Sequence, residues 1–174
     1  MKDIKSYIRS IPDYPKPGVL FYDLSTLILD PTGFRLAIDG MQEHASTLEI
    51  DKLVGIDSRG FVFGGALADR MKIGLVLARK PGKLPGKTVS YEYDLEYGSD
   101  KIELHSDSIT PGERVLVVDD LIATGGTLGA TCGLVEKLGG EVVGVSAVVG
   151  LDYLPYEERL SKYEINCLVK FHSE

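Results

Sequence analysis

Two adjacent carboxylates and a short glycine-containing loop form the part of the sequence best suited to chemistry. Asp119 and Asp120 follow the aliphatic run Val115–Val118, which predicts a buried strand that ends at the carboxylates. The loop Ala123–Thr127 comes next and leads into an apolar-periodic segment typical of a helix. Backbone N–H groups in such a loop can converge on an anion, and the helix dipole favours negative charge there. The loop's threonine hydroxyls and glycines strengthen the prediction of a phosphate-binding loop.

The two carboxylates need a different partner, because like charges repel and a phosphate is negative. They suit a neutral polyol, a metal ion or a developing cation. A sugar phosphate that reacts at its anomeric carbon offers the first and the third. The run lacks the Gly-Lys-Ser/Thr of nucleotide triphosphate loops and the Gly-x-Gly-x-x-Gly of dinucleotide-binding turns. A strand, turn and helix without any ligand is the ordinary alternative for a motif of this kind.

The whole run from Val115 to Thr127 resembles the phosphoribosyl-pyrophosphate motif of the type I phosphoribosyltransferases. By this resemblance, Asp119 and Asp120 hold the ribose hydroxyls of the donor. The resemblance assigns the ribose 5-phosphate to the loop residues Ala123, Thr124, Gly125, Gly126 and Thr127. It also implies Mg²⁺, bound mainly through phosphoribosyl pyrophosphate or pyrophosphate. Mg²⁺ prefers substrate phosphates and water as ligands, so no protein side chain is predicted to bind it.

The composition is that of one ordinary globular domain. The chain has 174 residues, of which 44% are hydrophobic and 26% charged. No apolar run reaches the ~20 residues that span a bilayer, and the N-terminus lacks a signal-peptide pattern, so we expect a cytoplasmic protein. The net charge of −7 argues against nucleic acid as a partner. Cys132 and Cys167 match no metal-site spacing and are expected to be buried free thiols.

Alternating strand and helix signals predict an α/β fold with a mostly parallel, twisted sheet flanked by helices. Helices are expected at Met1–Arg9, Pro31–Ala45, Gly60–Met71 and Gly126–Leu138. Strands are expected at Lys52–Ile56, Ile73–Ala78, Val115–Val118, Glu141–Val149 and Glu164–Phe171. Ligands in such folds bind outside the carboxyl ends of the strands, which is where the acidic pair and its loop fall.

Two segments depart from this alternation within a single domain of residues 1–174. Residues 1–30 contain the proline-locked stretch Pro12–Asp23, which is predicted to form a hood over a flat ring or, alternatively, to plug the core. Residues 80–113 begin with several Gly and Pro and continue with alternating apolar residues, which predict a long hairpin flap. Such a flap could close over a reacting sugar and exclude water from it.

A second strand-to-helix turn predicts a second anion site. Ser58 and Arg59 fall at the start of the helix expected from Gly60, and a guanidinium can bind phosphate through two hydrogen bonds. The turn resembles the pyrophosphate loop of the family, whose backbone often has a cis non-proline peptide. A basic cluster that could neutralise departing pyrophosphate consists of Arg79, Lys80, Lys83 and Lys87. A solvated surface loop is the alternative for this cluster.

The resemblance also extends to the acceptor, and it implies transfer to adenine with AMP and pyrophosphate as products. Members of the family that act on 6-oxopurines carry an aspartate inside the phosphate loop, where this chain has Ala123. A carboxylate for the base must therefore come from elsewhere, and the resemblance implies Glu96 in the flap. The catalytic residues implied by the resemblance are Arg59, Glu96, Asp119 and Asp120.

Adenine itself is expected in an apolar pocket, where Phe21 could stack on the ring. By resemblance, this pocket lies near Leu20, Phe21 and Leu121. Tyr22 departs from the family, whose members usually have an arginine at this position, directly before the aspartate that is Asp23 here. The sequence therefore does not show which residue makes the contact of that arginine in this chain.

Other functions stay open at this point. The same scaffold could transfer ribose 5-phosphate to xanthine or hypoxanthine. It could also serve a regulatory protein that senses phosphoribosyl pyrophosphate, although such regulators carry an added DNA-binding domain and the acidic charge of this chain disfavours DNA. By resemblance alone, the protein is expected to be a homodimer.

Overall fold

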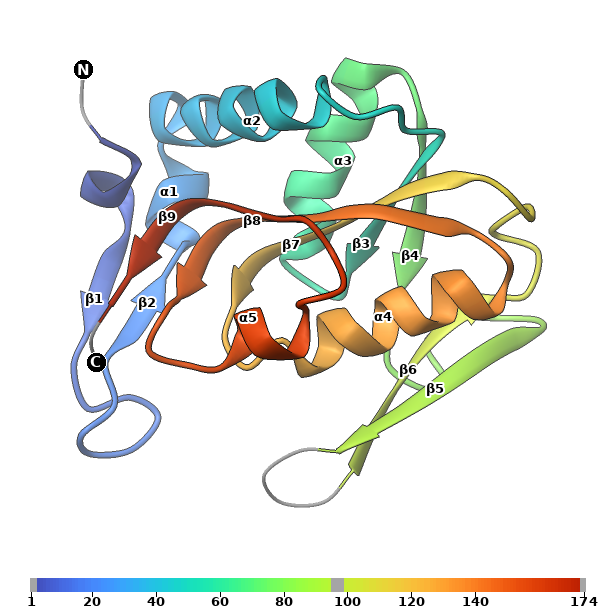
Figure 1. The fold of residues 1–174 in the computed structure, drawn as a ribbon. Coiled ribbons are helices and arrows are strands. Elements are labelled where there is room, and N and C mark those ends of the chain that lie inside the picture. Colours follow the sequence, from blue (N-terminus) through green and yellow to red (C-terminus); the bar gives the residue numbers. More distant parts are fainter. Residues whose placement is uncertain (1–2, 95–98, 173–174) are drawn as a thin grey trace.

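The computed structural model of the chain describes residues 3–94 and 99–172 and has the expected α/β architecture (Figure 1). Its central sheet has five parallel strands in the order β4-β3-β7-β8-β9. The strands are β1 (Arg9–Ile11), β2 (Phe21–Asp23), β3 (Lys52–Ile56), β4 (Gly74–Ala78), β5 (Thr88–Asp94), β6 (Ser99–His105), β7 (Arg114–Ile122), β8 (Glu141–Leu151) and β9 (Ile165–Phe171). The helices are α1 (Ser25–Leu29), α2 (Pro31–Ala45), α3 (Gly60–Met71), α4 (Gly126–Lys137) and α5 (Tyr156–Arg159), with a 3-10 helix at Ile4–Tyr7.

Helices cover both faces of the central sheet, which gives the domain two hydrophobic clusters (Figure 1). On one face, Met41 of α2 and Phe63 of α3 are fully buried together with Leu116 of β7. On the other face, Leu134 of α4 packs in a cluster with Val117 of β7. Because successive strand residues point to opposite faces, a strand covered on both sides needs a continuous aliphatic run.

Helix α2 begins after a capping residue, Asp30. The Asp30 carboxylate accepts hydrogen bonds from the backbone N–H groups of Thr32 and Gly33 at 2.8 and 3.0 Å. Pro31 occupies the first turn, where its missing N–H costs nothing. These local signals explain why the bounds of this helix match the prediction.

The β7 strand is longer than its aliphatic run. It continues through both carboxylates to Ile122, with Asp119 opposite Ala147 and Leu121 opposite Val149 of β8. The prediction that the strand ends at Asp119 is therefore wrong. The neighbouring strand β8 continues to offer hydrogen-bonding partners, so strand pairing extends beyond the hydrophobic sequence.

The N-terminal segment also differs from the prediction of a polar helix over Met1–Arg9. Its described part forms the 3-10 helix and then β1, which pairs antiparallel with β2 so that Arg9 lies opposite Asp23. A helix of so few residues gains little by itself, whereas strand pairing satisfies the backbone groups. The short helices α1 and α5 were not predicted, because one turn shows no detectable period.

Residues 80–113 contain the predicted hairpin, formed by β5 and β6 beside α4 (Figure 1). The strands are antiparallel, and Tyr93 lies opposite Asp100. At the base of the flap, the backbones of Arg79 and Glu103 exchange two hydrogen bonds. Glu96 lies outside the described residues, so its role stays a prediction.

The two cysteines are free, as predicted. Cys132 is buried, whereas Cys167 is only half-buried, so the prediction of burial is wrong for the second thiol. Burial raises the pKa of Cys132 to about 12 and that of Cys167 to about 11, which keeps both thiols protonated at neutral pH. Within residues 3–94 and 99–172, no helix is long and apolar enough to cross a membrane.

Candidate active site

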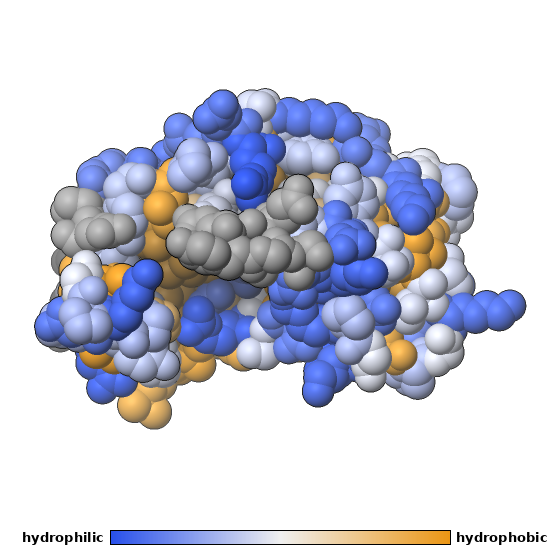
Figure 2. Space-filling model, turned by 90° about the horizontal axis from the view of Figure 1, so that it is seen from below, coloured by the Kyte–Doolittle hydropathy of each residue, from blue (hydrophilic) through white to orange (hydrophobic). Residues whose placement is uncertain are grey.

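A cavity of about 390 Å³ opens where the carboxyl ends of β3 and β7 lie side by side. This is the edge of a parallel sheet at which ligands bind. Figure 2 looks at this side of the molecule from below and shows a hollow bordered by hydrophobic and hydrophilic residues. The cavity is lined by Ile56, Asp57, Ser58, Arg59, Lys80, Asp119, Asp120, Leu121 and Thr127.

Arg59 and Asp120 meet within this cavity. Arg59 immediately precedes α3, and its Nε atom lies 2.6 Å from Oδ2 of Asp120, which is only 5% exposed. The Nε–H bond of Arg59 is not aligned with this Oδ2. Among the described residues, no group therefore makes a well-aligned hydrogen bond to it. Burial raises the pKa of Asp120, and the positive charge of Arg59 opposes that rise. The ion pair therefore holds Asp120 in place at the wall of the cavity.

Asp119 is held by the backbone around it. Its Oδ1 accepts the backbone N–H of Asp120 at 2.9 Å. The residue is half-buried and lines the cavity. This burial, followed by the charge of Asp120, raises the pKa of Asp119 well above its ordinary value. Two crowded carboxylates of this kind favour a partner that donates hydrogen bonds or carries positive charge.

The predicted phosphate loop lines a second cavity of about 120 Å³. All five predicted loop residues line it: Ala123, Thr124, Gly125, Gly126 and Thr127. Gly125, directly before α4, has a φ of +76°, a left-handed conformation that favours glycine. Asp119, Leu121 and Thr127 line both cavities, so one ligand can extend from the loop to Arg59.

The structure brings only some of the predicted pyrophosphate-binding residues to the larger cavity. Ser58 and Lys80 line it together with Arg59. Arg79 instead donates a hydrogen bond from Nε to Oδ2 of Asp57 at 2.9 Å, beside the Asp57–Ser58 peptide, which is cis. The exposed side chains of Lys83 and Lys87 line neither cavity, and their part in binding stays a prediction.

Of the residues predicted near adenine, Leu121 lies at the cavity, whereas Phe21 begins β2 and Leu20 directly precedes it. Leu20 and Leu121 pack against the same hydrophobic cluster, which brings the hood and the end of β7 to one side of the domain. In the hood, the Phe21 ring meets the ring of Tyr14 edge to face, with centroids 5.1 Å apart.

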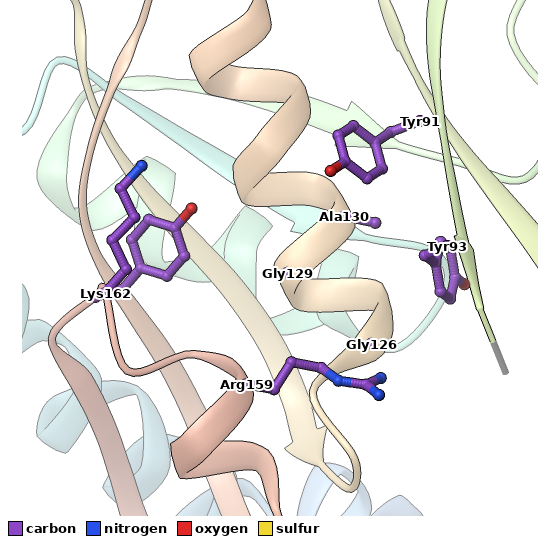
Figure 3. A pocket seen from close by; sticks show the side chains of 8 residues that line it. Tyr91, Tyr93, Gly126, Gly129, Ala130, Arg159 and Lys162 are labelled. Carbon is purple, nitrogen blue, oxygen red and sulfur yellow. The ribbon is translucent and has the colours of Figure 1, made fainter. Parts of the chain in front are cut away.

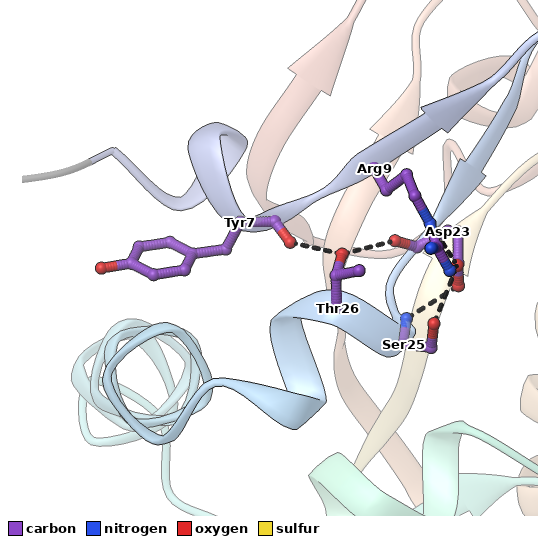
Figure 4. A network of polar contacts seen from close by, with 5 residues as sticks. All are labelled: Tyr7, Arg9, Asp23, Ser25 and Thr26. Carbon is purple, nitrogen blue, oxygen red and sulfur yellow. Dashed lines mark hydrogen bonds and ion pairs between the residues drawn. The ribbon is translucent and has the colours of Figure 1, made fainter.

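Tyr22, the residue that departs from the family, is buried and stacks on Phe171 with ring centroids 3.8 Å apart. The guanidinium that meets the neighbouring Asp23 comes from Arg9 of β1, whose Nε and Nη2 lie 3.2 and 2.5 Å from Oδ2 (Figure 4). Ser25 donates to the same carboxylate from its backbone N–H and its hydroxyl. These hydrogen bonds, that of Arg9 foremost, lower the pKa of Asp23 to about 2.

Three residues outside the predicted set also belong to the site. Asp57 lines the cavity, and Tyr93 and Asp100 of the flap contact Lys80 beside Thr127. Asp57 directly precedes Ser58 in the second strand-to-helix turn, whereas no short motif marks Tyr93 and Asp100, because their contacts join segments far apart in the sequence. The alternation of tyrosines in the flap was the only signal, and it indicated a strand rather than a site.

A third cavity of about 370 Å³ lies beside α4 (Figure 3). Tyr91 and Tyr93 of the flap border it on one side, and Arg159, at the end of α5, borders it on the other. Gly126 at the start of α4 lies between Tyr93 and Arg159. Neither carboxylate of the acidic pair lines this space.

Comparisons with known proteins identify the family of this chain. The family model for the phosphoribosyl transferase domain matches residues 28–173. An adenine phosphoribosyltransferase of Koribacter versatilis is 52% identical over 168 residues, which cover 97% of this chain and 92% of that protein. The crystal structure of adenine phosphoribosyltransferase from Thermoanaerobacter pseudethanolicus has a TM-score of 0.94 and 44% identity, covering 97% of this chain and 98% of that chain. The structure from Saccharomyces cerevisiae, complexed with an imino-altritol bisphosphate and adenine, has a TM-score of 0.89 and 36% identity, covering 95% and 96%. The chain therefore belongs to the phosphoribosyltransferase domain family and, within it, to the adenine phosphoribosyltransferases.

Proposed function

We propose that this protein transfers ribose 5-phosphate from phosphoribosyl pyrophosphate to adenine, giving AMP and pyrophosphate. The observation that carries the proposal is the position of the acidic pair between two anion-binding regions. Asp119 lines both cavities, with the phosphate loop around the smaller one and the cations Arg59 and Lys80 at the larger one. A donor that carries a phosphate at one end of its ribose and pyrophosphate at the other matches this order.

The acidic pair also suits the change in charge during the transfer. As the bond between the anomeric carbon and pyrophosphate breaks, the ribose gains positive character, which nearby carboxylates stabilise. Asp119 and Asp120 both line the larger cavity, so the acidic pair lies beside a ribose that binds there. Arg59 and Lys80 are placed to hold pyrophosphate as its negative charge grows.

Mg²⁺ would be bound mainly through the phosphates of the donor. In the described part of the chain, no group of three His, Cys, Asp or Glu side chains is placed to hold a metal ion. Asp119 and Asp120 line the donor cavity, and carboxylates are among the hard ligands that Mg²⁺ accepts, so the site fits a substrate-borne ion. When bound, the ion would neutralise charge on the leaving pyrophosphate.

The preference for adenine is supported by what surrounds the cavity. Ala123 leaves the phosphate loop without a carboxylate for the base, and Leu121 offers an apolar wall. Phe21 and Tyr14 in the hood offer aromatic rings on which a purine could stack. The yeast relative was solved with adenine bound. We infer that Glu96 exchanges the proton on the purine ring nitrogen.

We also infer a homodimer located in the cytoplasm. Leu77 on the edge strand β4 and Val62 on α3 are exposed apolar side chains that a second copy could cover. Two free cysteines fit a reducing compartment. A sedimentation measurement that finds a single copy at working concentration would contradict the dimer.

The function is tested by incubating the protein with phosphoribosyl pyrophosphate, Mg²⁺ and one base at a time. With adenine, AMP and pyrophosphate should form in equal amounts, and hypoxanthine or xanthine should give little product. Faster transfer to hypoxanthine or xanthine than to adenine would instead assign the protein to the oxopurine-specific members of the family. Binding of phosphoribosyl pyrophosphate without transfer to any base would favour a sensor.

A further inference from the structure

We propose that Asp100 is a positioning residue for the transfer. From strand β6 of the flap, it holds the Lys80 ammonium and the Tyr93 hydroxyl together beside Thr127 of the phosphate loop. The proposal rests on the transfer activity proposed above, and it assigns Asp100 no contact with the substrate.

Four side chains form one connected polar network at this point. Nζ of Lys80 donates to Oδ2 of Asp100 and, at 3.1 Å, to the hydroxyl of Tyr93. The Tyr93 hydroxyl lies 3.3 Å from the same Oδ2 and 3.0 Å from Oγ1 of Thr127. The network therefore joins the basic segment, both strands of the flap and the phosphate loop.

The backbone explains why these groups meet. Tyr93 and Asp100 are directly opposite each other in the β5–β6 ladder, so their side chains share one face of the hairpin. The Tyr93 ring lies beside Gly126 in the first turn of α4 (Figure 3). This close approach brings the tyrosine hydroxyl to Thr127, the next residue of the helix.

The position of Lys80 matters because this side chain lines the donor cavity together with Arg59 and Asp119. An ammonium has three N–H donors, and Asp100 and Tyr93 take two of them, which leaves one for a ligand. A free lysine side chain loses much rotamer freedom when it binds a phosphate. Holding Lys80 in advance reduces that cost at the moment of donor binding.

Electrostatics support a permanent ion pair. Partial burial acts to lower the pKa of Lys80, but the hydrogen bonds to Asp100 and Tyr93 outweigh it and the pKa is raised. The pKa of Asp100 is lowered, chiefly by its hydrogen bond with Lys80. Both groups are therefore charged at neutral pH.

A competing role for Asp100 predicts the opposite effect on binding. If the carboxylate only masked the charge of Lys80, its removal would strengthen the attraction for pyrophosphate and lower the KM for the donor. If it positions Lys80, its removal frees the lysine side chain and raises that KM. The direction of the change in the donor KM therefore distinguishes positioning of Lys80 from masking of its charge.

The experiment compares steady-state transfer by the wild-type protein with that by Asp100→Asn at varied phosphoribosyl pyrophosphate and saturating adenine. We expect the KM for the donor to rise about fivefold, the upper range for one partly exposed ion pair, with kcat changed less than twofold. Asp100→Glu, which keeps the charge, should recover part of the loss. The matched control is Lys101→Gln, which removes the neighbouring ion pair of the same hairpin, at 3.3 Å from Glu92, and should leave the KM unchanged.

A double-mutant cycle tests whether Asp100 acts through Lys80. In a Lys80→Met background, Asp100→Asn should change the KM for the donor by less than twofold. An equal rise in both backgrounds, or a fall in KM on Asp100→Asn, would overturn the proposal. If Asp100→Asn does not fold, Asp100→Ser replaces it, because serine also removes the carboxylate that holds Lys80; an unchanged donor KM in that variant would equally overturn the proposal. A wild-type protein that forms no AMP would refute the proposed function, whereas an active wild type with an unchanged Asp100→Asn variant refutes the positioning role alone.

Discussion

A Cβ atom on Gly60 would lie 2.9 Å from Oδ1 of Asp119 and 3.0 Å from the backbone oxygen of Val118. The first turn of α3 therefore packs directly against β7 at the start of the acidic pair. Arg59 precedes this turn and reaches Asp120 at 2.6 Å. The distance between the cation and the carboxylates thus depends on the absence of a side chain at residue 60.

Gly60→Ala should lower kcat/KM for AMP formation about tenfold, because the added methyl group displaces Asp119 from the ribose site. It should also cost roughly 1–3 kcal/mol of unfolding free energy through overpacking. Gly65→Ala is the control on the same helix, where a Cβ meets nothing within 4 Å. That variant should keep its activity and gain up to about 1 kcal/mol of stability from helix propensity. Wild-type activity in Gly60→Ala would show that this contact does not set the site.

Asp119→Asn should make the protein more stable and much less active. The pKa of Asp119 is raised by burial, so ionisation penalises the folded state above its folded pKa, and the penalty disappears as the pH falls toward the unfolded value of 3.8. Asparagine keeps an oxygen for the backbone N–H of Asp120 and removes the charge. The stability gain in urea unfolding should be larger at pH 8 than at pH 4.5, while kcat/KM falls at least about tenfold. A gain that does not depend on pH would argue against a charge effect.

Asp23→Asn should destabilise the protein through the network of Figure 4. Because the pKa of Asp23 is lowered to about 2, its contribution is present above the unfolded value of 3.8 and is lost as the pH falls through about 2. We expect a loss of roughly 1 kcal/mol at pH 7, a modest value because the Arg9 partner is more than half exposed. Urea unfolding at pH 7 and near pH 2 measures it, and an equal loss at both values would contradict the assignment.

The sequence predicted those elements whose residues carry a clear local signal. The bounds of α3 and β3 match the predictions, because each lies between turn residues and has a continuous apolar pattern. The extension of β7 through Asp119 could not be foreseen, since it depends on hydrogen bonds offered by β8. The position of the loop Ala123–Thr127 beside the acidic pair was also predicted, as these residues are close together in the chain.

The rest of the site depends on contacts between distant segments. Tyr93 meets Thr127 and Asp100 meets Lys80 only because the flap folds back beside α4. Likewise, the basic residues look equivalent in sequence, but Lys80 lines the cavity while Arg79 binds Asp57. The direction of a side chain at the end of a strand depends on the residues that surround it in space. A pattern of residue types along the sequence does not give that information.

Glu96→Gln should lower turnover at least about tenfold and leave the binding of phosphoribosyl pyrophosphate largely intact, because an amide cannot exchange the purine proton. Glu92→Gln is the control on the same hairpin, where the carboxylate pairs with Lys101. Single-turnover rates and donor binding by calorimetry separate the two effects. Unchanged turnover in Glu96→Gln would remove this residue from the mechanism.

The role of the acidic pair in the transfer is tested by comparing AMP formation by the wild-type protein with that by the Asp119→Asn/Asp120→Asn double variant. AMP and pyrophosphate are measured together, with thermal unfolding as the check of folding. We expect one pyrophosphate for each AMP in the wild type and at least about a hundredfold slower transfer in the folded double variant. A folded double variant that forms AMP at the wild-type rate would show that the acidic pair at the end of β7 is not the place where the ribose reacts.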